Sequence, residues 1–297
     1  MCRGGWSPAS ADTRGPRLPL GRRLESRLIC LGYPSASRSL ERPLVNLRDI
    51  ALVRATFRSV SYSAHARRAF TSAFYSNLFG RDPGLRQLFP VSMEAQRERF
   101  VAAVEYVLEN LDNPGQLEEF LEQLARDHRK YGVQSSHYRA AADALHAAMR
   151  SYTGPAFWTD SIDAAWRAAV DLIANAMIAG AESDDLPPHW DATVVAHHKV
   201  LDDLALVRLQ ADAPIPYEAG QYVAVRIPQR PRMWRYLSPA IPSNEYGEIE
   251  FHVRNVRGGW VSPSIVNASQ PGDRWTIGAP LGGLHVDYEC GRDVLMI

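Results

Sequence analysis

The sequence changes its hydrophobic periodicity once, and this change constrains the fold more than any other feature. From about Leu47 to Glu182, apolar residues recur at the spacing of one face of an α-helix. After the polar, proline-bearing segment AESDDLPPHWD, short runs rich in β-forming residues follow one another between Pro, Gly and Asn turns. The sequence therefore predicts an all-α domain followed by a small antiparallel β-barrel, in a multidomain chain.

Turn-forming segments divide the helical region into about six helices. The breaks are FGRDPG, DNPGQ, YGVQSS and YTGPAF. The best-defined helix is expected from Gln96 to Leu111, before the Asn-Pro-Gly sequence at 113–115 ends it. The last helix follows FWTDS and has Trp166 on its apolar face.

We expect five segments along the chain. They are an N-terminal extension (1–44), the helical domain (45–183), a linker (184–191), the β-barrel (192–290) and the first strand of a truncated third unit (291–297). The extension is rich in Arg, Ser, Pro and Gly and poor in acidic residues. It resembles an organellar transit peptide, but a disordered tail or sequence translated upstream of the true start explains it equally well.

Composition narrows the classes of function. The 297 residues include 33 basic and 33 acidic side chains, and this balance gives no support for a nucleic-acid or acidic-surface partner. No apolar run reaches the length of a membrane span. The three cysteines are scattered and form no CxxC pair, so a disulfide framework or thiolate metal site is not indicated. We therefore expect a cytoplasmic protein without a membrane partner.

One histidine lies at an unusual position, in the segment LARDHRKYGVQSSHY. Leu117, Phe120, Leu121 and Leu124 define an apolar helix face, and His128 continues it. A histidine on such a face needs either a backbone carbonyl as partner, which is the commoner arrangement, or a metal. A haem iron requires a neutral imidazole that a rigid helix holds in an apolar pocket.

The helical region resembles the globin domain of flavohaemoglobins. The resemblance is carried by FTSAFYSNLFGRDPGLRQLFP, EAQRERFVAAVEYV and the histidine segment. It implies a haem b cofactor with His128 as the iron ligand, and with Phe89 and Phe100 against the porphyrin. It also implies a distal pair, Tyr75 and Gln96, whose hydrogen bonds would hold dioxygen at the iron.

The resemblance extends to the proximal side, with one departure. Tyr138 corresponds to the family's proximal tyrosine, which acts with a glutamate on the last helix to polarise the ligand histidine. We expect that glutamate five residues before Trp166, where this chain has Ser161. Asp160 and Asp163 are the neighbouring carboxylates. The departure concerns the electron density at the iron rather than haem binding.

The segments RMWRYLSPA and VRGGWVSPSIV point to a flavin. A guanidinium pairs well with pyrophosphate, and a hydroxyl three residues later can reach the isoalloxazine ring. Glycines before a helix let backbone N–H groups approach a phosphate. The region is similar to the FAD-binding barrel of the ferredoxin-reductase family, which flavohaemoglobins carry after the globin. On that resemblance the FAD-binding residues are Arg235, Ser238, Gln221, Tyr222, Gly258, Gly259, Val261 and Ser262.

One residue of this flavin motif departs from the family. The aromatic residue that usually precedes the serine is Leu237, although Tyr236 is adjacent. We expect the loss of this ring to weaken stacking on the flavin.

The combined resemblance implies a haem- and FAD-containing oxidoreductase, namely a nitric oxide dioxygenase with Tyr75, Gln96 and Tyr138 as its catalytic side chains. Dioxygen and nitric oxide would be its substrates. The electron donor would be NAD(P)H in a full-length form, or a separate reductase, because the sequence has no GxGxxG-like element and RDVLMI resembles only the start of a nicotinamide domain.

Three other interpretations remain open at this point. The first is a globin that binds or senses a gas without turnover. The second is a flavin oxidoreductase that passes electrons from another donor to haem. The third is an α-plus-β protein without cofactors.

Overall fold

The structure is a computed structural model of the whole chain, and it describes residues 46–283. The extension assigned to 1–44 and the strand expected at 291–297 lie outside the described residues.

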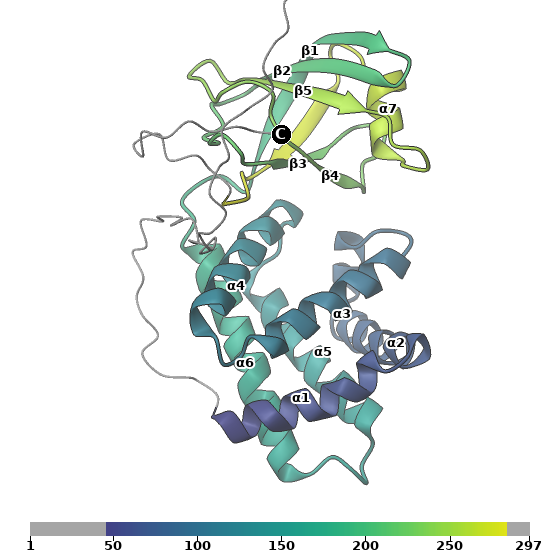
Figure 1. Cartoon of the computed structure of the whole chain (residues 1–297), viewed down its shortest axis with the longest axis vertical. Coiled ribbons are helices and arrows are strands. Elements are labelled where there is room, and N and C mark those ends of the chain that lie inside the picture. Colours follow the sequence, from purple (N-terminus) through teal and green to yellow (C-terminus); the bar gives the residue numbers. More distant parts are fainter. Residues whose placement is uncertain (1–45, 284–297) are drawn as a thin grey trace, which may run out of the picture. The chain divides into compact units, whose positions relative to one another are not determined.

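The helical domain is all-α, as the sequence predicts (Figure 1). Its elements are α1 (Leu47–Ser61), α2 (Ala64–Arg81), η1 (Pro83–Leu88), α3 (Glu94–Glu109), α4 (Pro114–His128), η2 (Arg129–Tyr131), α5 (Ser135–Thr153) and α6 (Asp160–Glu182). Helix α3 begins and ends two residues before the expected helix. It ends early because Asn110 leaves helical geometry and caps the helix, with its backbone and side-chain nitrogens both donating to Tyr106 O.

Helix α6 holds the helical core together. It packs against α1, α4 and α5. Trp166 is fully buried, and its indole nitrogen donates to Thr56 Oγ1 on α1 at 2.8 Å. Near the other end, a Cβ on Gly180 would lie 2.9 Å from the backbone of Glu122 on α4. The missing side chain at position 180 therefore lets α4 approach α6 closely.

Asp163 in the first turn of α6 connects three neighbouring side chains. It accepts hydrogen bonds from Trp158 Nε1 at 2.8 Å and from Arg167 Nε at 3.0 Å, and it lies 3.1 Å from His146 Nε2 on α5. These contacts hold the pKa of Asp163 below its usual value, chiefly through the hydrogen bond from Trp158. Asp163 therefore fixes the connection between α5 and α6.

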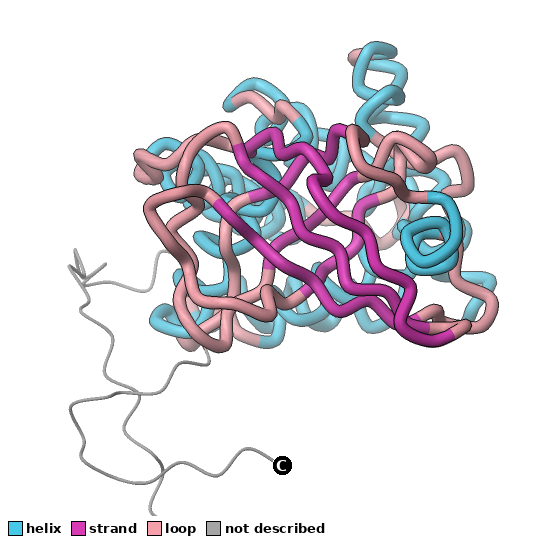
Figure 2. The backbone as a smooth tube through the Cα atoms, turned by 90° about the horizontal axis from the view of Figure 1, so that it is seen from above, coloured by secondary structure: helices cyan, strands magenta, loops and turns pink. Residues whose placement is uncertain are grey.

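The second domain is a curled antiparallel sheet, whose strands are drawn in magenta in Figure 2. The strand order is β4-β3-β6-β1-β2-β5. The elements are β1 (His189–Leu201), β2 (Leu204–Ala211), β3 (Val223–Arg226), β4 (Trp234–Leu237), β5 (Glu248–Arg254), α7 (Val261–Ala268) and β6 (Arg274–Gly278). Side chains alternate between a buried and an exposed face along β5, as a one-sided core requires.

Two details of this sheet differ from the expectation. The segment VAHHKVLDDLALVRLQA forms a hairpin, with Asp202 and Asp203 in the turn between β1 and β2. Strand β1 begins at His189, before the expected start at Ala192, because residues 189–193 pair with β6. Over the described residues the strand pairs form a linear order rather than a closed ring, so the barrel is open between β4 and β5.

Among the helices of residues 46–283, none combines the length and apolar character needed to cross a membrane.

We predict that Asp163→Asn lowers the unfolding free energy of the helical domain by about 1–3 kcal/mol, because a buried imidazole and an indole lose a charged partner. Asp160→Asn is the matched control, since Asp160 is exposed in the same helical turn. Urea unfolding followed by far-UV circular dichroism measures both variants. Equal effects of the two substitutions would show that Asp163 contributes only as a charge at the helix start.

Candidate functional site

His128 is the last residue of α4, and its ring is fixed by its own helix. Its Nδ1 atom lies 2.6 Å from Leu124 O, one turn earlier. The carbonyl can only accept, so Nδ1 carries the proton and Nε2 keeps a free lone pair. Burial lowers the pKa of His128, which favours the neutral imidazole. A neutral, oriented imidazole with a free Nε2 is what a metal ligand requires.

Two tyrosines lie beside this imidazole. The ring centroids of Tyr131 and Tyr138 are 6.1 Å and 6.4 Å from that of His128. Tyr138 Oη is enclosed and has no hydrogen-bond partner among the described residues. Burial raises the pKa of Tyr138 to about 12, so its phenol keeps its proton at neutral pH.

The expectation that Ser161 replaces the proximal glutamate is wrong. Ser161 is in the first turn of α6, whereas the α6 residues that line a cleft with Tyr138 are Ala181 and Glu182. The two ends of α6 are about 30 Å apart at 1.5 Å per residue. Glu182 is the carboxylate at the correct end, and its Oε1 accepts a hydrogen bond from Ser135 Oγ at 2.8 Å.

The residues predicted to contact the distal side of a haem lie around Tyr75 on α2. The ring centroids of Phe89 and Phe100 lie 5.5 Å and 5.8 Å from that of Tyr75, which is only 3% exposed. Phe100 also stacks on Phe74 in the core, at 4.0 Å. The structure therefore brings together three aromatic residues that are distant in the sequence.

Tyr75 has an enclosed hydroxyl without a well-formed hydrogen bond. Burial raises its pKa to about 12, while the nearby Gln96 amide and the Arg97 charge act in the opposite direction. Gln96 and Arg97 belong to the first two turns of α3, so the start of this helix sets the polarity around the phenol.

The polar atoms of these groups fit a haem. Buried polar atoms are normally paired, and leaving one unpaired costs about 1–3 kcal/mol. The phenol oxygens of Tyr75 and Tyr138 are enclosed without a well-formed hydrogen bond among residues 46–283. The Nε2 atom of His128 is left free by the hydrogen bond that Nδ1 makes to Leu124 O. An iron-porphyrin would use the imidazole as its ligand and the aromatic side chains as its apolar surroundings.

In the β domain, the predicted phosphate loop is built around two glycines. Gly258 has φ of +78°, a conformation that favours glycine. A Cβ on Gly259 would lie 2.9 Å from Val256 O. The hydroxyl of Ser262 accepts a hydrogen bond from Val256 N at 3.1 Å, which ties the loop to α7 and leaves the hydroxyl proton free to donate.

Helix α7 starts directly after this loop. No side chain among residues 46–283 caps its first turn. Val261, the first residue of α7, is fully buried and anchors the helix start in the β-domain core. An uncapped helix start behind a glycine turn suits a pyrophosphate.

The remaining predicted flavin residues differ in how available they are. Arg235 and Ser238 are exposed, and within the described part of the chain the guanidinium of Arg235 bonds only to Trp234 O, at 3.1 Å. The amide of Gln221 is already used, since it accepts from Glu218 N at 2.9 Å and donates to Gly282 O at 3.2 Å. Gln221 therefore braces the loop, while Arg235 is free to bind an anion.

Aromatic surface near the flavin motif comes from residues other than position 237. Leu237 is partly buried against the β-domain core. The Tyr236 ring lies 5.2 Å from that of Tyr222 on the neighbouring chain segment. These two tyrosines therefore supply aromatic rings near the flavin motif although position 237 is a leucine.

Sequence reasoning missed the pair Arg230 and Trp260. Trp260 directly precedes α7, is 62% exposed, and has the Arg230 guanidinium 5.6 Å from its ring centroid. The only signal in the sequence was a tryptophan between the two glycines and the valine of the phosphate loop.

Two family models match the chain. The globin model matches residues 72–177, and the oxidoreductase FAD-binding domain model matches residues 191–286. The first range includes Tyr75, His128 and Tyr138, and the second includes the predicted FAD-binding residues.

Curated relatives join the two domains in one chain. The flavohemoprotein of Bordetella pertussis is 29% identical over 272 residues, which is 83% of this chain and 66% of the relative. The flavohemoprotein of Bacillus subtilis is 25% identical over 244 residues, covering 76% of this chain and 60% of the relative. The chain thus spans about two thirds or less of the length of these relatives.

A solved structure has the same fold. The crystal structure of flavohemoglobin from Malassezia yamatoensis, with bound FAD and heme, superimposes with a TM-score of 0.63 at 20% identity. The match covers 80% of this chain and 64% of that chain.

We predict that His128→Ala abolishes haem retention and leaves FAD bound, because the two groups of residues belong to different domains. His65→Ala is the control, since His65 is exposed on α2. Absorbance of the purified variants reports both cofactors. Loss of FAD together with haem would contradict two separate sites.

Proposed function

The chain belongs to the flavohaemoglobin family, and we propose that it is a haem and FAD oxidoreductase that converts nitric oxide to nitrate. Nitric oxide, dioxygen and one electron combine to give one nitrate ion, so the reaction needs an oxygen site and an electron path. The observation that carries the proposal is His128, whose free Nε2 is oriented by Leu124 O.

When bound, haem supplies an iron that takes up dioxygen, and FAD supplies electrons one at a time. The chain's own residues orient these groups and control protons. His128 would hold the iron from α4, and Phe89 and Phe100, which pack against the helical core, would provide apolar contact with the porphyrin.

On the distal side, Tyr75 acts as a hydrogen-bond donor. Its raised pKa keeps the proton on the phenol oxygen at neutral pH. Since the hydroxyl has no well-formed hydrogen bond among residues 46–283, it is available to a polar ligand. Gln96 lies beside it and orients the phenol.

On the proximal side, we assign Tyr138 and Glu182 to the positioning of His128. Tyr138 lies beside the imidazole. Tyr138 and Glu182 line the same cleft. A carboxylate that accepts the phenol proton in a hydrogen bond would increase the electron density at the ligand.

In the β domain, FAD binds through backbone and side chain together. The Gly258–Gly259 turn and the N–H groups that open α7 would receive the pyrophosphate, with Arg235 as the matching cation. Ser238 would reach the isoalloxazine ring with its hydroxyl, and Tyr222 would line the flavin pocket.

A single-turnover experiment tests the function without assuming an electron donor. Reduced, haem-loaded protein is exposed to dioxygen and then mixed with one equivalent of nitric oxide. We expect about one nitrate per haem, quantified by ion chromatography. Nitrite without nitrate would contradict a dioxygenase and favour a gas-binding role.

We predict that Tyr75→Phe accelerates dioxygen release by about tenfold or more, which corresponds to the loss of one hydrogen bond of about 1.4 kcal/mol. Tyr62→Phe is the control, because Tyr62 is 91% exposed. Stopped-flow displacement by carbon monoxide measures the release rate. An unchanged rate would remove Tyr75 from the ligand site.

We predict that Glu182→Gln raises the reduction potential of the haem iron, because the neutral amide donates less electron density through Tyr138. Asp185→Asn removes the same charge from a neighbouring exposed position and is the control. Potentiometric titration followed in the visible spectrum measures both. Equal shifts would show a general charge effect instead of a path through Tyr138.

A further inference from the structure

A cleft of about 270 Å³ lies between the beginnings of α2 and α3. Three arginines line it: Arg67 and Arg68 from α2, and Arg97 from α3. Glu94 and Glu98 also line the cleft. None of these five side chains forms an ion pair with any other residue in the described part of the chain.

The arginines are placed where a cation is unfavourable. Arg67 and Arg97 each hold the fourth position of their helix, near the positive end of the helix dipole. Arg67 Nε is enclosed and has no hydrogen-bond partner among residues 46–283. A buried, unpaired guanidinium nitrogen next to two other arginines calls for an anionic partner.

Arg97 connects this cleft to the distal tyrosine. Its Nη1 donates to Ser72 Oγ at 2.6 Å, and its guanidinium carbon lies 5.8 Å from the ring centroid of Tyr75. An anion that binds Arg97 therefore changes the electric field at Tyr75 without entering the distal site itself.

The charge of the lining selects the kind of anion. Three arginines and two glutamates give the cleft a formal net charge of +1. A monoanion balances this charge. A phosphate dianion would leave the cleft with a net negative charge and would be repelled more strongly by the two carboxylates. Guanidinium groups bind planar oxyanions through paired N–H donors.

We propose that this cleft binds a monoanionic oxyanion of the nitrate class. We also propose that an anion bound to Arg97 changes the electric field at Tyr75. The identity of the ligand rests on the proposed function, since nitrate is the product of that reaction. The cleft is then a place where product collects beside the distal site before it leaves the protein.

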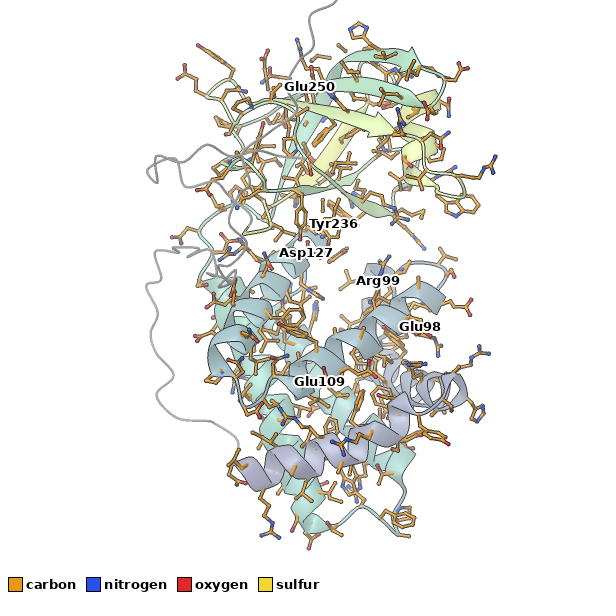
Figure 3. All side chains as sticks on the ribbon, viewed as in Figure 1. Glu98, Arg99, Glu109, Asp127, Tyr236 and Glu250 are labelled. Carbon is orange, nitrogen blue, oxygen red and sulfur yellow. The ribbon has the colours of Figure 1, made fainter. Side chains whose placement is uncertain are left out.

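Isothermal titration of the haem- and FAD-loaded chain with nitrate, at constant ionic strength, tests the site. We expect saturable binding that Arg67→Gln and Arg97→Gln weaken by about tenfold or more, as the loss of a charged hydrogen bond implies. Arg99→Gln is the matched control, because Arg99 lies on α3 (Figure 3). It is not among the residues that line the cleft. Its affinity should stay at the wild-type value.

A further variant distinguishes a loss of nitrate binding from a loss of folding, because it should bind nitrate more tightly. Glu98→Gln removes a negative charge from the lining, so it should bind nitrate more tightly than the wild type. Absence of saturable nitrate binding, equal weakening by Arg99→Gln, or tighter binding of phosphate than of nitrate would each overturn the proposal.

The coupling to Tyr75 has its own readout. With carbon monoxide on the reduced haem, the C–O stretching frequency reports the local field, and nitrate should shift it in the wild type but not in Arg97→Gln. This measurement involves no turnover. If single-turnover nitrate formation fails while nitrate still binds and shifts this frequency, the function is wrong and the anion site holds. If nitrate forms normally but does not bind, only the anion site is wrong.

Discussion

The hydrogen bond from His128 Nδ1 to Leu124 O is the interaction on which the proposed iron site depends. It selects the tautomer, fixes the ring plane and leaves Nε2 free. The bond exists only while the last turn of α4 is helical. Close approach of α4 to α6 at Gly180 supports that turn, so a glycine 52 positions after the histidine contributes to the geometry of the ligand.

The two domains prepare their ligand sites by different physical means. In the globin domain two phenol oxygens are enclosed without a well-formed hydrogen bond among residues 46–283, which costs stability in the absence of a ligand. The β domain instead offers backbone N–H groups at a glycine turn and an uncapped helix start, together with the Arg235 guanidinium. Side-chain substitutions should therefore affect the first site more than the second.

Periodicity predicted the class and order of the elements because the two domains bury one face of each element, at spacings of 3.6 and 2 residues. Periodicity failed where contacts between elements determine which side chains lie together. Counting along α6 led to Ser161, because sequence position does not reveal which end of a helix meets Tyr138. The cleft of Arg67 and Arg97 was missed for the same reason, since each arginine by itself resembles an ordinary solvated residue.

The visible absorbance spectrum of the purified chain tests the central claim most directly. The sample is expressed with ample haem and measured oxidised, and then reduced under carbon monoxide. We predict a Soret band that shifts when the gas binds, above a flavin contribution. A spectrum without a Soret band would mean that His128 is a structural histidine bonded to Leu124 O, and that the iron site proposed for α4 does not exist.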